Sequence, residues 1–137
     1  RLASQPDLAR TAADEIVRWV TPVRHFCRTA TADTRVHGID IAAGESVVLF
    51  YPSGNRDEAV FDDPFRFDVR RSPNPHVAFG HGTHFCLGAN LARYELQLLF
   101  GALVQRFRAP EVVTEPDVEA NVFARAVRRF DVRLTPR

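Results

Sequence analysis

The sequence contains no methionine and no lysine, and it has only two cysteines, Cys27 and Cys86. Its eighteen basic residues are therefore all arginines, and with seventeen acidic residues they leave a formal net charge of +1. So balanced a charge argues against a nucleic-acid partner. Two cysteines are too few for a disulfide framework, so we expect a reducing, cytoplasmic environment. Without methionine the chain does not open at an ordinary start codon, and we expect a fragment of a longer protein.

Long apolar runs are also missing. No run of about eighteen apolar residues occurs, so no membrane span is predicted, and no basic-then-apolar signal segment opens the chain. The 137 residues, 45% of them hydrophobic, are enough for one compact core but not for two domains. We therefore expect residues 1–137 to be part of a single domain.

Two segments have the pattern of regular structure near the N-terminus. Residues 11–20 predict a helix, with Thr11 as its cap and with Asp14 and Glu15 in its first turn, where negative charge is favourable. Residues 29–51 alternate β-branched and polar side chains around turns at His37-Gly38 and Ala43-Gly44. They predict a small antiparallel sheet with strands at 34–36, 39–41 and 46–51.

The second half of the chain combines a long loop, a helix and short strands. Residues 52–78 are rich in proline and lack a period, but Phe61, Phe65 and Phe67 suggest that this loop packs against the core. Residues 88–107 carry two apolar stripes at helical spacing, which predicts a helix that is buried on most sides. Residues 110–137 predict short strands and turns.

Cys86 lies in an unusual setting, in the segment HVAFGHGTHFCLGANLARYEL of residues 76–96. A buried core thiol is the simplest interpretation. A zinc site with His81 and His84, and with His76 as an additional candidate, has suitable ligands but lacks a second ligand pair. A phosphate-binding loop would need a third glycine that is missing here. A cysteine nucleophile would need a base, and His84 is too close in sequence to Cys86 to serve as one.

The Cys86 thiol also precedes a helix N-terminus, which favours a thiolate. Glycines beside it clear space for a flat group, and thiolate ligation of haem iron is one such arrangement.

The motifs resemble those of one family. Phe79 to Gly88, FGHGTHFCLG, is similar to the F-x-x-G-x-x-x-C-x-G haem signature of the cytochrome P-450 family. The segment EIVR resembles the E-x-x-R motif of that family's K helix, with Glu15 and Arg18. The segment PFRF resembles its meander motif, Pro64 to Phe67, with Arg66 as the arginine.

The resemblance implies a mainly α fold with small β-sheets. It would be the C-terminal portion of the cytochrome P-450 fold, of bacterial or actinobacterial type: the K helix, a small sheet, the meander, the cysteine haem loop, the L helix and C-terminal β turns. The N-terminal part of the family's domain, with its I helix, would be absent. The implied cofactor is haem b, iron protoporphyrin IX.

The resemblance also implies residue roles. Cys86 would be the metal ligand and catalytic thiolate. The remaining haem-binding residues would be Phe79, which shields the sulfur, Gly80, Gly82 and Gly88, and His84 and Arg28, which would bind propionates. For His84 a bond to the loop backbone, and for Arg28 a solvated place at the sheet edge, stay open. Glu15, Arg18 and Arg66 would form a buried structural network, although an exposed helix pair is the alternative for Glu15 and Arg18.

Two segments correspond to parts of the family's substrate pocket, in residues 20–26 and 120–127. The pocket candidates are Val23, Arg24, His25, Phe26, Val122 and Phe123, with ordinary core packing as the alternative. Cys27 is expected to be a plain core or pocket residue, and His76 and His81 receive no role.

For the intact protein the resemblance implies a monooxygenase. It would insert one oxygen atom from O2 into an apolar small molecule, with a lipid or sterol as the expected class, using electrons from ferredoxin and ferredoxin reductase. Activity of this chain alone is not expected. The alternative is a truncated or pseudogene product without catalytic activity, at most a haem-binding module.

Overall fold

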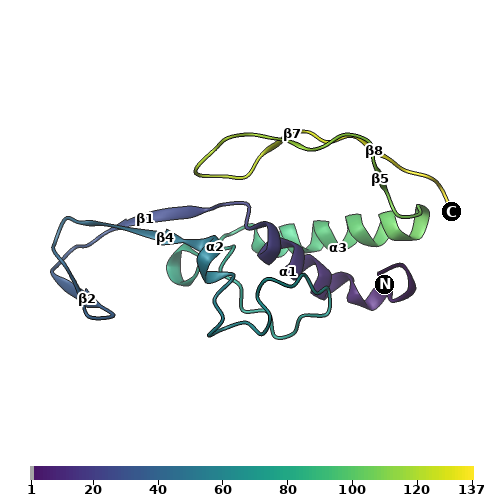
Figure 1. The fold of residues 1–137 in the computed structure, drawn as a ribbon. Helices are drawn as coiled ribbons and strands as arrows, with labels where there is room; N and C mark the ends of the chain where they lie inside the picture. The colour runs from purple at the N-terminus through teal and green to yellow at the C-terminus, as the bar shows by residue number, and fades with distance from the viewer. Residues whose placement is uncertain (1) are drawn as a thin grey trace.

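The structure, a computed structural model, describes residues 2–137. Its two longer helices lie side by side, and a ribbon of two strands extends away from them (Figure 1). The helical elements are η1 (Leu2–Ser4), η2 (Pro6–Leu8), α1 (Ala9–Val20), α2 (Tyr51–Gly54), η3 (Gly82–His84) and α3 (Ala89–Arg106). The strands are β1 (His25–Thr29), β2 (Thr34–Val36), β3 (Ile39–Ile41), β4 (Ser46–Phe50), β5 (Glu111–Val112), β6 (Asp117–Val118), β7 (Val127–Arg129) and β8 (Val132–Arg133).

Helix α1 begins at Ala9 rather than at the predicted residue 11. Thr11 is therefore inside the helix and does not cap it. Its hydroxyl donates to the carbonyl of Val69 at 2.6 Å, which fastens the helix to the long loop. No acidic residue lies in the first turn, so the predicted stabilisation of Asp14 and Glu15 by the helix dipole is wrong. Both carboxylates instead contact cationic side chains.

The C-terminal end of α1 is closed by side chains. Thr21 has a left-handed φ of 43°, and its hydroxyl donates to the carbonyl of Arg18 at 2.7 Å. The guanidinium of Arg56 lies 4.3 Å from the centre of the Trp19 ring and donates to the Trp19 carbonyl at 2.9 Å. These contacts satisfy carbonyl groups that have no partner within the helix.

The predicted strands form, but they pair as two ladders and not as one sheet. β2 and β3 make a hairpin in which Thr34 faces Ile41. Its turn has φ values of 47° at His37 and 82° at Gly38, the signature of a tight hairpin turn. β4 pairs instead with β1, a partner from the segment just after α1. Because β1 passes beside Cys86, this second ladder is the one that forms part of the site.

The long loop of residues 52–78 packs against α1 through only part of its length. Phe61 is buried as predicted. Phe67 is partly exposed, but its ring lies 5.6 Å from that of Trp19. Phe65 is exposed, so the prediction is wrong for this residue. The loop is held mainly by polar contacts.

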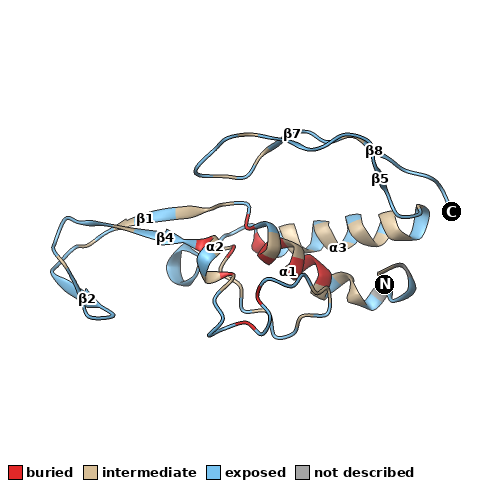
Figure 2. Ribbon diagram, viewed as in Figure 1, coloured by how far each residue is buried: buried red, intermediate tan, exposed pale blue. Residues whose placement is uncertain are grey.

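Helix α3 has the predicted bounds within one residue at each end but not the predicted burial. Only Ala89 among its residues is buried, and Leu91 is 61% exposed. In Figure 2 the helix is coloured almost wholly as intermediate or exposed. The apolar stripes are real, but burial requires a partner on each face, and α1 covers just one. Residues 110–137 form short strands as predicted, and they run past α3 as a separate arm (Figure 1). Among residues 2–137 no helix has both the length and the hydrophobicity needed to cross a membrane.

The buried core is small and unusually polar. It centres on α1, with further buried positions in α2, the long loop and the start of α3 (Figure 2). Its largest fully buried side chains are Arg18, Glu15 and Asn55. The Asn55 amide donates to the Thr21 hydroxyl at 2.9 Å, and its carbonyl accepts the N–H of Val77 at 2.8 Å. Asn55 thus connects the end of α1 to the approach to the cysteine loop.

Candidate haem-thiolate site

The cysteine loop is closed by its own backbone. The N–H of Cys86 donates to the carbonyl of Phe79 at 2.8 Å, and the carbonyl of Cys86 accepts the N–H of Ala89 at 3.2 Å. These bonds place Cys86 directly before the first turn of α3. Cys86 therefore lies in the short segment that leads into the N-terminus of α3.

The loop glycines differ in what they contribute. Gly80 has a φ of +74°, and a Cβ there would come within 3.2 Å of the His84 carbonyl oxygen. Gly82 has a φ of +69° with open space around it, so its backbone conformation is what favours glycine. A Cβ at Gly88 would lie 4.0 Å from the Cys86 sulfur. The positive φ values of Gly80 and Gly82 thus account for glycine through turn geometry, while the expected cleared face beside the thiol stays a prediction.

One pocket, of about 410 Å³, gathers most of the predicted haem-binding residues. It is lined by Pro22, Val23, Phe26, Arg28, Tyr51, Ala78, Phe79, Gly80, His84 and Cys86. Apolar side chains form much of the wall, and a guanidinium and an imidazole reach it from two different elements. This set fits a flat apolar ring with acidic substituents and a metal that accepts a thiolate. Two of the predicted haem-binding residues, Gly82 and Gly88, are not among the described residues that line this pocket.

The substrate-pocket candidates separate into two groups. Val23 and Phe26 line the pocket of Cys86, and the ring of Phe123 lies 5.4 Å from that of Phe26. Arg24 instead lines a different pocket, with Arg56, and is not among the residues that line the pocket of Cys86.

The remaining two candidates lie away from the lining. The His25 ring contacts the Phe123 ring at 5.9 Å, and Val122 is exposed. The backbone of the two segments does meet, because the N–H of Arg24 donates to the carbonyl of Phe123 at 2.8 Å. Residues 20–26 and 120–127 therefore lie together, while their contact with a substrate stays a prediction.

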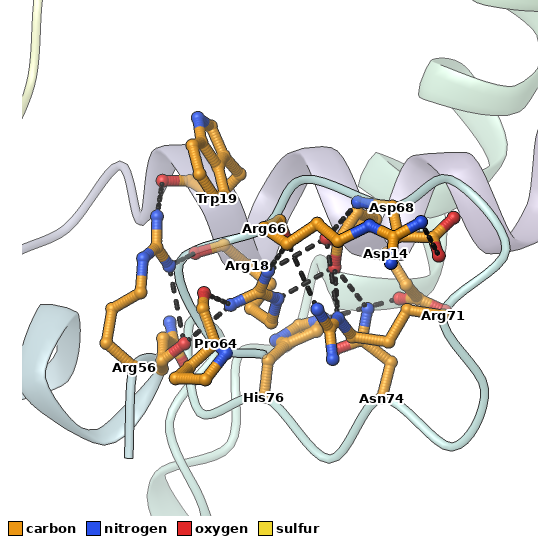
Figure 3. Close-up of polar contacts among 12 residues, drawn as sticks. Asp14, Arg18, Trp19, Arg56, Pro64, Arg66, Asp68, Arg71, Asn74 and His76 are labelled. Carbon is orange, nitrogen blue, oxygen red and sulfur yellow. Dashed lines mark hydrogen bonds and ion pairs between the residues drawn. The ribbon is translucent and has the colours of Figure 1, made fainter. Parts of the chain in front are cut away.

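Glu15 and Arg18 form a fully buried ion pair, with both side chains 0% exposed. Arg18 binds the carboxylate through two nitrogens, at 2.7 and 2.8 Å. It also donates to the carbonyls of Asn55 at 2.8 Å and Pro64 at 2.9 Å (Figure 3). The exposed helix pair considered from the sequence is thereby excluded.

The second arginine of this network is Arg71 and not Arg66. The Arg71 Nε lies 3.2 Å from a Glu15 oxygen, and its side chain is only 9% exposed. The Arg66 side chain is 64% exposed and reaches Asp63 and Asp68 at 4.0 and 3.9 Å. Arg66 contributes its backbone carbonyl, which accepts bonds from Arg18 and Arg71 (Figure 3). The sequence prediction for Arg66 is therefore wrong.

The carboxylate of Glu15 is stabilised in its charged form. Burial acts to raise its pKa, but hydrogen bonds from Arg18 and from the N–H of Asp68 outweigh burial, together with the charges of Arg18 and Arg71. The pKa of Glu15 therefore lies below its ordinary value. Asn74 adds a further bond to the same carboxylate at 3.2 Å.

Three residues to which the sequence gave no site role meet beside the cysteine loop. Asp14 accepts a hydrogen bond from Arg93 of α3 and contacts His76, and both of these partners approach Phe79. The sequence gives no signal for these contacts of Asp14. Asp14 is adjacent to Glu15, and adjacent helix positions point in different directions, so the role of Glu15 does not predict the partners of Asp14.

The described residues do not assemble the ligands of a zinc site. Within the part of the chain that the structure describes, no group of three or more His, Cys, Asp or Glu side chains is placed to hold a metal ion. His81 is exposed, and His76 lies against Asp14. The zinc alternative for Cys86 therefore lacks its donor set.

Comparison with known proteins gives a consistent result. Residues 7–133 match the family model described as Cytochrome P450. The chain is 45% identical over 128 residues to a steroid C26-monooxygenase of Mycobacterium tuberculosis, covering 93% of this chain and 30% of that protein. It is 42% identical over 132 residues to cytochrome P450-terp of a Pseudomonas species, covering 96% and 31%.

Solved structures agree. The crystal structure of CYP108D1 from Novosphingobium aromaticivorans superposes with a TM-score of 0.93 at 38% identity, covering 100% of this chain and 33% of that one. The chain thus spans about a third of the length of the proteins it matches. With its cysteine loop, its buried Glu-Arg network and these similarities, the chain belongs to the cytochrome P450 family.

Proposed function

We propose that this chain supplies the thiolate side of a haem pocket, with Cys86 as the ligand of the iron. The observation that carries the proposal is the shared lining of one pocket by Cys86, Phe79, Arg28 and His84. These residues come from β1 and from the cysteine loop, segments far apart in the sequence. Their convergence provides a thiolate, an apolar wall and two groups able to bind acidic substituents.

Each side chain has a separate task in this proposal. Cys86 would present its sulfur from the start of α3, where backbone N–H groups stabilise the thiolate. Arg28 and His84 would bind the two propionates, because a guanidinium and an imidazole donate to carboxylates. Phe79 would exclude water from the sulfur. Gly80 is required for the turn that brings these groups together.

The intact protein would then be a monooxygenase that inserts one oxygen atom from O2 into an apolar small molecule. Haem b, when bound, supplies the oxygen-activating chemistry. Val23 and Phe26 would form the apolar part of the wall that faces the substrate. A sterol or another branched lipid is the class we favour, since relatives are named steroid C26-monooxygenase. Electrons would come from a ferredoxin and its reductase, in the cytoplasm.

One observation favours the alternative, a haem-binding module without catalysis. Several apolar side chains of α3 are exposed, among them Leu91, Tyr94 and Leu98. Exposed apolar surface of this kind promotes association and lowers stability. The protein expressed from its complete reading frame decides between the two: substrate oxidation with haem, ferredoxin and reductase supports the enzyme, and haem binding without turnover supports the module.

The two cysteines provide a matched test of the iron ligand. We expect the reduced, CO-bound protein to show the absorption band of a thiolate-ligated haem. Cys86→Ser removes the sulfur and should abolish that band. Cys27→Ser removes an exposed thiol that is not part of the pocket and should preserve it. A Cys86→Ser protein that kept the thiolate band would refute the assignment.

A further inference from the structure

Asp14 connects two helices and the loop between them through one carboxylate oxygen. Its Oδ1 accepts a hydrogen bond from Nε of Arg93 at 2.6 Å and lies 3.3 Å from Nε2 of His76. The His76 side chain is only 1% exposed, while Asp14 and Arg93 are 27% and 28% exposed. α1, the approach to the cysteine loop and α3 therefore meet at this point (Figure 3 shows Asp14 and His76).

The hydrogen bonds define how His76 is protonated. The N–H of Ala78 donates to Nδ1 of His76 at 3.3 Å, so this nitrogen is an acceptor. Nε2 then carries the proton and donates it toward Asp14. Burial acts to raise the pKa of Asp14, but the hydrogen bonds from His76 and Arg93 and the charge of Arg93 lower it. Asp14 is therefore held as a carboxylate that orients both partners.

Both partners of Asp14 contact the same aromatic ring. The Arg93 guanidinium lies 4.8 Å from the centre of the Phe79 ring, within cation–π range. The His76 ring lies 5.7 Å from it, and the ring of Phe85 lies 6.4 Å away. Phe79 itself lines the pocket that contains Cys86. The position of this ring is thus determined by residues outside the pocket.

We propose that Asp14, His76 and Arg93 form a positioning cluster that fixes the Phe79 ring in the wall of the pocket that Cys86 also lines, and so favours ligation of the iron by the thiolate over the thiol. The inference rests on the proposed haem-thiolate function. None of the three residues lines the pocket, so their effect passes through Phe79. Without the Asp14 charge, Arg93 is drawn into solvent and His76 loses its acceptor. The ring then has two fewer fixed neighbours.

The test uses the haem-loaded protein expressed from its complete reading frame. Asp14→Asn keeps the shape of the side chain but removes its charge, and Arg93→Met keeps its length but removes the guanidinium. The readout is the ratio of thiol-ligated to thiolate-ligated haem in the reduced CO complex, measured on the haem-containing fraction. Asp40→Asn is the control, because Asp40 lies in an exposed ion pair with Arg35.

We expect each of Asp14→Asn and Arg93→Met to raise the ratio of thiol-ligated to thiolate-ligated haem by about tenfold. Effects of this size are typical of residues that orient a metal site without binding the metal themselves. The double variant should match the stronger single variant and not the product of both, because the two act as a unit. Asp14→Glu should restore most of the original ratio, and Asp40→Asn should leave it unchanged.

The remaining outcomes distinguish failure of the positioning cluster from failure of the proposed function. An unchanged ratio in Asp14→Asn and Arg93→Met overturns the positioning cluster while leaving the proposed function intact. Full multiplication of the two single effects overturns the claim that they act together. If Asp14→Asn holds too little haem for measurement, Arg93→Met provides the same decision. A thiolate band missing from the unsubstituted protein refutes the proposed function itself, before any variant is compared.

Discussion

Replacing Arg71 by methionine should destabilise the protein far more than the same replacement at Arg66. Both are arginines of the same loop, five residues apart, and a sequence motif alone assigns the buried role to Arg66. In the structure Arg71 lies 3.2 Å from the fully buried carboxylate of Glu15, whereas Arg66 is 64% exposed. Each is therefore the other's matched control.

The magnitude follows from what each variant leaves behind. Arg71→Met leaves a buried carboxylate with one of its two guanidinium partners, and breaking a buried ion pair costs about 3–5 kcal/mol. Glu15 keeps the two bonds from Arg18 and the N–H of Asp68, so we expect about 3 kcal/mol, the lower end of that range. The carbonyls of Asp62 and Asp63 that Arg71 binds are near the surface, and water can replace the lost donor. Arg66→Met breaks only exposed, long ion pairs and should cost about 0–1 kcal/mol.

Urea denaturation measures the difference directly. The single tryptophan, Trp19, lies on α1 directly after Arg18 and provides a fluorescence signal from the network's own helix. Circular dichroism should give the same transition for each protein. Equal losses of unfolding free energy in the two variants, or a larger loss for Arg66→Met, would refute the assignment of Arg71 to the network.

Two further predictions concern the network and the cysteine loop. Folding lowers the pKa of Glu15, so as the pH drops the unfolded chain takes up its proton first. The unfolding free energy should therefore fall as the pH drops below 4.5, the ordinary pKa of a glutamate, and it should fall less steeply in Arg71→Met. Urea titrations at a series of acidic pH values measure this dependence. A pH dependence that is identical in both proteins would contradict this. Gly80→Ala should cost about 1–3 kcal/mol because of its left-handed φ of +74° and the nearby His84 carbonyl. Gly101→Ala, in the interior of α3 with open space around it, should instead stabilise the protein by about 0.5–1 kcal/mol. Equal effects at the two glycines in thermal unfolding would show that the turn is not strained.

The polar core explains why a chain with few fully buried apolar side chains has defined contacts. Glu15, Arg18 and Asn55 each satisfy several partners from the long loop. Such a network is stable only when it is complete, because one missing partner leaves a buried charge. We therefore expect the fold to be sensitive at these positions and tolerant at exposed ones such as Arg66.

Local sequence was sufficient for the elements whose determinants are local. The helix of residues 88–107 and the hairpin at His37-Gly38 were predicted within a residue, because helical spacing and turn chemistry act over a few positions. The glycine pattern around Cys86 likewise predicted a sharply turned loop. The buried Glu15 and Arg18 pair was predicted from the resemblance of EIVR to the family's E-x-x-R motif, with which the shared helix face of residues three apart is consistent.

Tertiary structure decided the choices between equivalent residues. Arg66 and Arg71 have the same chemistry, and only the path of the loop brings one of them to Glu15. The apolar stripes of α3 predicted burial, but burial depends on which elements lie against each face, and most of α3 remains exposed in the chain described. Asp14 met Arg93 and His76 across 79 and 62 residues of sequence. The sequence by itself thus determined the cysteine loop and its family, while the three-dimensional path of the chain determined which charged groups support it, because ion pairs between distant segments leave no periodic signal.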